Sequence, residues 1–170
     1  MKSLFQSVAG RRCLVFSLSF FLSLAVFFYL PGGAHAKNAS GPAQIVGFWL
    51  TQKGDACVQF YSAGRSKGRP GFLGRLSWLR QPNDENGKPS LDGNNPDPAL
   101  RSRPILGLVI IHAVYGGGGQ WKGTVYDPDN GRTYGCSIRL AGPDTMKLRG
   151  YLGFSLFGRT ETWKRVKRNL

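Results

Sequence analysis

The fold is decided by the stretch Ile105–Leu140, which reads ILGLVIIHAVY, GGGG, QWKGTVY, DPDNG and RTYGCSIRL in turn. Its first eleven residues are almost continuously apolar, as in a well-buried strand. The glycine run Gly116–Gly119 and the turn-forming run Asp127–Gly131 then divide the rest into alternating segments. The three predicted strands are Ile105–Tyr115, Gln120–Tyr126 and Arg132–Leu140. Short turns between them predict an antiparallel meander.

The same pattern extends in both directions from this stretch. Five more segments are predicted as strands: Ile45–Thr51, Asp55–Ser62, Phe72–Arg80, Met146–Leu152 and Arg159–Val166. A basic Gly/Pro region, Gly64–Gly71, is predicted as a turn, and no segment has a convincing helical period. About eight short strands over residues 45–166 predict an all-β fold, either a sandwich or a small antiparallel up-and-down barrel. Glycines inside or beside the strands favour the closed barrel, because closure requires strong coiling. These are Gly74, Gly107, Gly123, Gly150 and Gly153.

The N-terminal segment, residues 1–36, is predicted to be a cleavable signal peptide. Lys2, Arg11 and Arg12 precede the apolar run Cys13–Leu30, and Pro-Gly-Gly and Ala-His-Ala follow it. The alternative is an uncleaved anchor, but the run of 18 residues is short for a membrane span, which takes roughly 20. Cleavage would leave a chain exported to the periplasm or the extracellular space.

The exported chain would have 134 residues, enough for one domain, and a formal net charge of +11 in place of +14. Residues 37–44 are predicted to be a mobile leader and residues 167–170 a basic tail. The positive charge favours an anionic envelope surface or ligand as a partner. Export argues against nucleic acid, and the oligomeric state stays open.

Two cysteines remain in the predicted domain, Cys57 and Cys136. An oxidising compartment permits a disulfide between them. Strand alternation opposes it, however: with Val58 inward, Cys57 faces outward, whereas Cys136 faces inward together with Ile138. A bond would need both on one side of the sheet, or a bulge.

The long connection Gln81–Arg103 is the strongest functional candidate, because connections of this length in small domains are often functional. Within it, Asp92, Asn95 and Asp97 are expected to fasten the loop through side-chain to backbone bonds. Arg101 and Arg103 would then lie near one barrel mouth, where a guanidinium suits a carboxylate or phosphate. The alternative is that Arg101 pairs with Asp97 or Asp92 and simply closes the barrel end.

Aromatic side chains form the second set of candidates for binding a ligand. Small eight-stranded barrels either fill their interior with side chains or leave room for one small ligand. The candidates are Trp49, Trp78, Trp121, Trp163, Tyr126 and Tyr134, with Arg149 as a further partner for an anionic end.

The sequence gives little support for a catalytic site or a metal site. His112 lies in an apolar strand, as a core or edge histidine does, and no nucleophile elbow is near it. The run Asp127-x-Asp129-x-Gly131 begins like a calcium loop, but Ile138 stands where the bidentate acid belongs. Glu161 lies in phase with Arg159, which favours a structural salt bridge. We therefore expect no metal, no cofactor and no enzyme.

Several motifs together resemble the exported bacterial family called domain of unknown function 2147. They are Gly47–Trp49 (a G-x-W opening), Asn95–Gly107, Trp121–Tyr134, Leu148–Tyr151 and Gly158–Arg165. The resemblance covers essentially the whole predicted domain and implies a lipocalin-like barrel behind a signal peptide. It leaves the biochemical role open.

Three functions are compatible with the sequence. The leading hypothesis is a lipocalin-like protein that binds a small amphipathic or anionic ligand in the cell envelope. The alternative is a packed barrel that acts as an envelope interaction module through its basic surface and the tail beginning at Lys164. A hydrolase is the third, and scarce acids with one isolated histidine argue against it.

Overall fold

A computed structural model describes residues 41–151 and 158–167 of the 170-residue chain. The elements run in the order η1 (Pro42–Ile45), β1 (Gly47–Leu50), β2 (Ala56–Ser66), β3 (Arg69–Leu79), η2 (Pro98–Leu100), β4 (Val109–Gly117), β5 (Gln120–Asp127), β6 (Arg132–Gly142), β7 (Thr145–Tyr151) and β8 (Gly158–Val166). The predicted signal peptide lies outside the described residues, as do half of the leader and most of the tail. Within the described part, no helix is long and apolar enough to cross a membrane.

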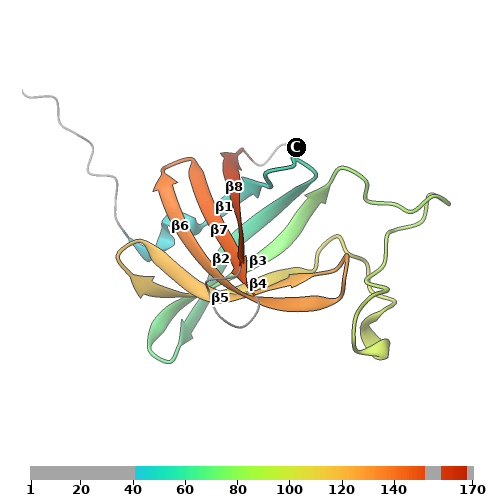
Figure 1. The fold of residues 1–170 in the computed structure, drawn as a ribbon, viewed down its shortest axis with the longest axis horizontal. Helices are drawn as coiled ribbons and strands as arrows, with labels where there is room; N and C mark the ends of the chain where they lie inside the picture. Colours follow the sequence, from blue (N-terminus) through green and yellow to red (C-terminus); the bar gives the residue numbers. More distant parts are fainter. Residues whose placement is uncertain (1–40, 152–157, 168–170) are drawn as a thin grey trace, which may run out of the picture. The chain divides into compact units, whose positions relative to one another are not determined.

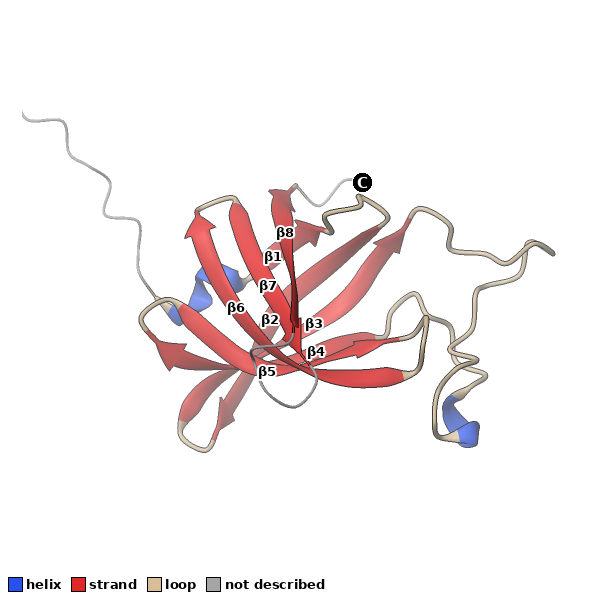
Figure 2. Ribbon diagram, in the orientation of Figure 1, coloured by secondary structure: helices blue, strands red, loops and turns tan. Residues whose placement is uncertain are grey.

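The strands form a closed antiparallel barrel in which each pairs with its neighbour in sequence (Figures 1 and 2). Closure joins the first strand to the last, with Trp49 opposite Arg165. The predicted all-β, eight-stranded up-and-down barrel is confirmed, and the sandwich is excluded. Gly123 shows how tightly the wall is built, because a Cβ there would lie 1.8 Å from the carbonyl oxygen of His112 on β4.

Three sequence-based boundaries were wrong. The β2–β3 hairpin extends far into the predicted turn region, so that only Lys67 and Gly68, both with positive φ, form the turn. Residues 105–108 precede β4, since Gly107 has a φ of 95° that an extended strand does not adopt. The first strand begins at Gly47 and not at Ile45, because Ile45 ends η1 and is buried there.

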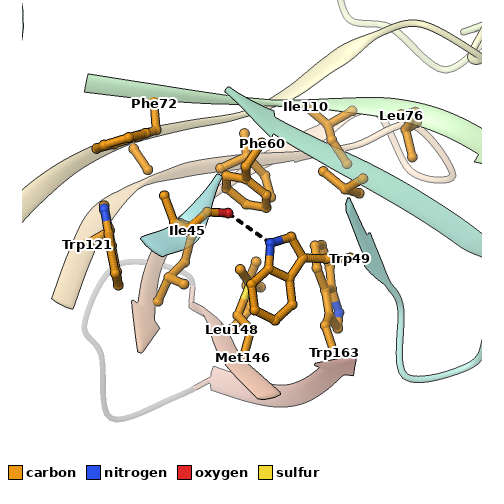
Figure 3. Close-up of a cluster of buried hydrophobic side chains, with 14 of the residues drawn as sticks. Ile45, Trp49, Phe60, Phe72, Leu76, Ile110, Trp121, Met146, Leu148 and Trp163 are labelled. Atoms are coloured by element: carbon orange, nitrogen blue, oxygen red, sulfur yellow. Dashed lines mark hydrogen bonds between the residues drawn. The ribbon is translucent and has the colours of Figure 1, made fainter. Parts of the chain in front are cut away.

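Large side chains fill one end of the barrel, and Ile45, Trp49, Phe72 and Trp121 of this end are labelled in the buried cluster of Figure 3. Trp49, Trp121 and Ile45 are all fully buried, and Phe72 meets Trp121 edge to face. The indole of Trp49 donates to the Ile45 carbonyl at 2.8 Å, which anchors η1 to the interior. Burying indoles of this size supplies a large share of the hydrophobic stabilisation.

Arg165 completes the filled end. Its guanidinium carbon lies 4.2 Å from the centre of the Trp49 ring. Its nitrogens donate to the carbonyl oxygens of Gln44, Val46 and Pro143. One side chain therefore satisfies orphaned carbonyls around η1 while stacking on the core tryptophan.

The two cysteines are free, and the predicted possibility of a disulfide is not realised. Cys57 pairs across the β2–β3 ladder with Trp78 and borders a shallow outer groove. Cys136 alternates with the inward Tyr134 and Ile138, as predicted. The thiols therefore lie on opposite sides of the barrel wall, although both are buried.

Candidate functional site

The other end of the barrel holds a cavity of about 970 Å³. Its inner wall is aliphatic and includes Val58, Leu76, Leu79, Ile110, Val125 and Leu148. A bulge in the β3–β4 ladder sets the floor, because it turns Ile110 toward the interior beside Ile111. This volume lies at the upper end of the ~300–1,000 Å³ typical of ligand pockets. The barrel is thus packed at one end and hollow at the other.

Charged side chains line the mouth of this cavity. Lys53 and Asp55 come from the β1–β2 connection, Arg80 follows β3, and Arg159 begins β8. Several of the polar groups are already satisfied: Asp55 accepts from the Thr51 hydroxyl at 2.6 Å, and Arg80 donates to the Gly54 carbonyl at 2.8 Å. Lys53 forms no ion pair with any described residue, and Arg159 is 71% exposed.

Three inward-facing side chains of β8 line the cavity at increasing depth, from its mouth to its floor. Arg159 lies at the rim, Glu161 below it and Trp163 at the floor. One Glu161 oxygen accepts from the indole of Trp163 at 3.0 Å, and the other lies 3.8 Å from Arg159 Nε. The predicted Arg159–Glu161 pair is present, but at this length and exposure it contributes little to stability.

The β3–β4 connection is fastened through one buried carboxylate, that of Asp92, which is 0% exposed. Asp92 accepts hydrogen bonds from Tyr126 Oη at 2.5 Å, Asn95 Nδ2 at 2.7 Å and Arg103 Nη2 at 3.0 Å. Tyr126 belongs to β5, so this contact ties the loop to the barrel wall. Buried carboxylates are tolerated when they are hydrogen-bonded, and here both oxygens of Asp92 accept bonds, Oδ1 from Tyr126 and Oδ2 from Asn95 and Arg103.

The pKa values of this pair move apart. Burial alone raises the pKa of Asp92, but the hydrogen bonds from Tyr126, Asn95 and Arg103 outweigh it and lower the pKa below its ordinary 3.8. Burial, together with donation to Asp92, raises the pKa of Tyr126 above 10.0. Around neutral pH Asp92 is therefore an anion and Tyr126 a neutral donor.

The other predicted site residues of the β3–β4 connection, Arg101 and Asp97, form hydrogen bonds within the connection itself. Arg101 Nε donates to the Asn95 carbonyl at 2.7 Å, and Asp97 caps η2 by accepting from the Ala99 amide. Asn94 donates to the Asp129 carbonyl at 2.9 Å, which docks the loop on the β5–β6 turn where both project from the barrel (Figure 1). The partner of Asp92 is thus Arg103, not Arg101.

The structure places the other predicted binding residues in four locations. Tyr126, Tyr134 and Trp163 line the cavity. Trp49 and Trp121 are packed in the filled end, and Trp78 borders the outer groove. Arg149 faces outward and donates to Thr160.

Sequence reasoning missed the charged residues of the mouth, Lys53, Arg80 and Arg159. The signal that could have found them is positional: each lies at a strand end or in a connection on the same side of the barrel as Asp127–Gly131. In an up-and-down barrel such positions share one rim. No side-chain motif marks them.

Comparisons with known proteins support the fold. A search of the curated proteins finds no match. A solved structure titled as a lipocalin-family protein, HP1028 from the human pathogen Helicobacter pylori, is similar at a TM-score of 0.56 and 24% identity, over 72% of this chain and 83% of that one. At this identity the likeness shows the lipocalin-like fold alone.

The closed eight-stranded barrel, with the G-x-W tryptophan in its first strand, matches the fold that the sequence motifs implied. A family profile agrees over nearly the whole barrel. Residues 47–165 match the profile described as an uncharacterized protein conserved in bacteria, domain of unknown function 2147, and the chain belongs to that family.

Proposed function

We propose that this protein binds one small amphipathic molecule in the barrel cavity, with the apolar part inside and an anionic end at the mouth. The observation that carries the proposal is the division of the interior into a filled end and an aliphatic cavity of about 970 Å³ with a charged rim. An apolar pocket with a few polar groups at one end is the usual form of a small-molecule site.

The position of the anionic end rests on Lys53 and Arg159. Both line the mouth, Lys53 has no carboxylate partner among the described residues, and Arg159 holds Glu161 only at 3.8 Å. The nearby acids Asp55 and Asp127 are engaged by Thr51 and Asn130. Glu161 accepts from Trp163, and among the lining acids of the described residues only Asp129 accepts no hydrogen bond through its carboxylate, so two of the three least engaged charges at the mouth are cations.

The proposed setting is the cell envelope. The N-terminal segment has the three parts of a signal peptide, and a cleaved chain would carry the barrel into the periplasm or beyond. There, a barrel that shields an apolar chain from water would serve as a carrier or a sensor of envelope amphiphiles.

The test is binding of 1-anilinonaphthalene-8-sulfonate, a fluorescent probe with an apolar body and one sulfonate. Val125→Trp fills the cavity from β5, and Thr124→Trp, its neighbour, adds the same side chain to an exposed position. The proposal predicts one site that Val125→Trp abolishes and Thr124→Trp retains. Equal binding by both variants, with equal thermal stability, would contradict it.

Displacement of the probe then identifies the preferred head group. Dodecanoate, dodecanol and dodecylammonium share one chain and differ only in charge. We expect dodecanoate to compete best, and Lys53→Gln with Arg159→Gln to remove its advantage over dodecanol. Lys88→Gln, in the exposed β3–β4 loop, is the matched control. A preference for dodecylammonium would overturn the anionic assignment.

A further inference from the structure

The outer face of β5–β8 carries a cationic patch formed by five side chains from four adjacent strands. Lys122, Arg139, Lys147 and Lys164 are exposed, and Arg149 is half-buried. Each alternates with a buried residue such as Trp121, Ile138 or Met146, so the strand pleat directs all five outward. The strand spacing of ~4.8 Å makes the patch about 14 Å wide.

No outward-facing residue of β5–β8 within the described ranges is an acid. The neighbours of the cations are hydroxyls and small residues such as Ser137, Thr145 and Thr160. Lys122, Arg139, Lys147 and Lys164 form no ion pair with described residues. The charges of these four side chains are therefore not neutralised by an acid of the described residues.

Two of these cations oppose one another across the sheet. Arg139 and Lys147 are direct partners in the β6–β7 ladder, with Cβ atoms about 5 Å apart. Like charges in this arrangement destabilise the sheet, and a Thr or Ser partner would serve the fold better. An arrangement unfavourable to the fold is expected where an external anion compensates it.

We propose that the outer face of β5–β8 docks on an anionic phospholipid surface. The patch is a convex sheet of charges and hydroxyls. Tyr151, at its edge, is half-buried against Gly135, and the patch has no row of exposed aromatic rings on which successive bases could stack. Ammonium and guanidinium groups spread over several strands instead suit a laterally continuous layer of phosphates. This inference concerns the outer wall and stands whether or not the cavity binds a ligand.

The test is sedimentation with vesicles. The full-length chain is expressed, and the form that accumulates in the host envelope is purified. It is mixed with vesicles of phosphatidylglycerol and phosphatidylcholine in a one-to-two ratio, or of phosphatidylcholine alone. Neutral vesicles report any binding through the apolar N-terminal segment. We expect binding to the anionic vesicles alone, lost when salt shortens the Debye length.

The decisive pair of variants carries equal net charge. Arg139→Gln with Lys147→Gln removes two patch charges, and Arg69→Gln with Lys88→Gln removes two exposed charges elsewhere. The patch variant should bind about thirtyfold more weakly and the control nearly as the parent does. The patch variant should also unfold at a higher temperature, because the opposed charges are gone.

Three results would overturn the proposal. Equal loss in the two variants would show that only the net charge matters. Equal binding to neutral vesicles would place the contact elsewhere. Tight binding to soluble polyphosphate without binding to vesicles would identify an anionic polymer as the partner.

Discussion

Replacing Asp92 with alanine should destabilise the domain by about 3 kcal/mol. Three donors converge on this carboxylate at 2.5, 2.7 and 3.0 Å. A hydrogen bond to a charged group contributes roughly 1.5–3 kcal/mol, so the complete loss of all three bonds would cost more than about 3 kcal/mol. Arg103 is 41% exposed, however, and recovers water when its partner is lost. We therefore count only the bonds from Tyr126 and Asn95, each at the lower value of about 1.5 kcal/mol, which gives about 3 kcal/mol.

The assay is thermal unfolding followed by near-ultraviolet circular dichroism. For a domain of this size a loss of 3 kcal/mol lowers Tm by about 10 °C. Asp97→Ala is the matched control, because it removes an acid from the same loop but breaks only the cap of η2, which contributes about 1 kcal/mol. Equal Tm values for the two variants would refute the role assigned to the buried carboxylate.

The pH dependence gives an independent check. The folded pKa of Asp92 lies below its ordinary 3.8, so the unfolded chain binds the proton more readily in acid. The stabilisation is thus fully present above about pH 4 and is lost as the pH falls through the folded pKa. Wild type and Asp92→Asn should therefore differ most near neutral pH and converge in acid. A difference that persists at the lowest pH would contradict the linkage.

Two further predictions concern the contact between the β5–β6 turn and the β3–β4 loop, and the two thiols. Gly131→Ala should lower the free energy of unfolding by about 2–4 kcal/mol, because a Cβ there would lie 1.8 Å from the Asn94 carbonyl oxygen and Gly131 has a φ of 69°. The control Gly118→Ala, whose Cβ would lie in open space, should change this free energy by about 1 kcal/mol. Equal urea midpoints would contradict this. Burial raises the pKa of the Cys136 thiol to about 12, and Cys57 is also buried, so neither should react with a thiol reagent at pH 8 in the folded protein. Once the protein is unfolded, both should react without a reductant. Fewer than two reactive thiols in denaturant would indicate a disulfide.

The sequence was most informative where local patterns are decisive. Alternation and turn residues located the meander from β4 to β6, and the inward phase of Ile138 correctly placed Cys136 inside. The wrong strand boundaries came from features that the local sequence does not show. The prediction began the β4 strand at Ile105, but Gly107 adopts a positive φ, which residue identity alone does not reveal. The β2–β3 hairpin was underestimated for a related reason, since its partner strand overrides weak local propensity.

The candidate site was predictable only in part. Asp92, Asn95 and Asp97 were predicted to fasten the loop through side-chain to backbone bonds. Asn95 and Asp97 do accept from backbone amides, whereas Asp92 accepts from side chains. Its main partner on the barrel, Tyr126, lies 34 residues away, and no spacing rule connects them. Whether the barrel is hollow depends on which side chains fill the interior, and that follows from register and bulges such as the one at Ile110.

The most direct test of the central claim is an NMR titration with dodecanoate. If one amphiphile enters the cavity, the indole signal of Trp163 at its floor should shift and saturate at one equivalent. The indole of Trp49, bonded to Ile45 in the filled end, should remain in place. Shifts confined to outer residues such as Thr124, with Trp163 unmoved, would contradict the account.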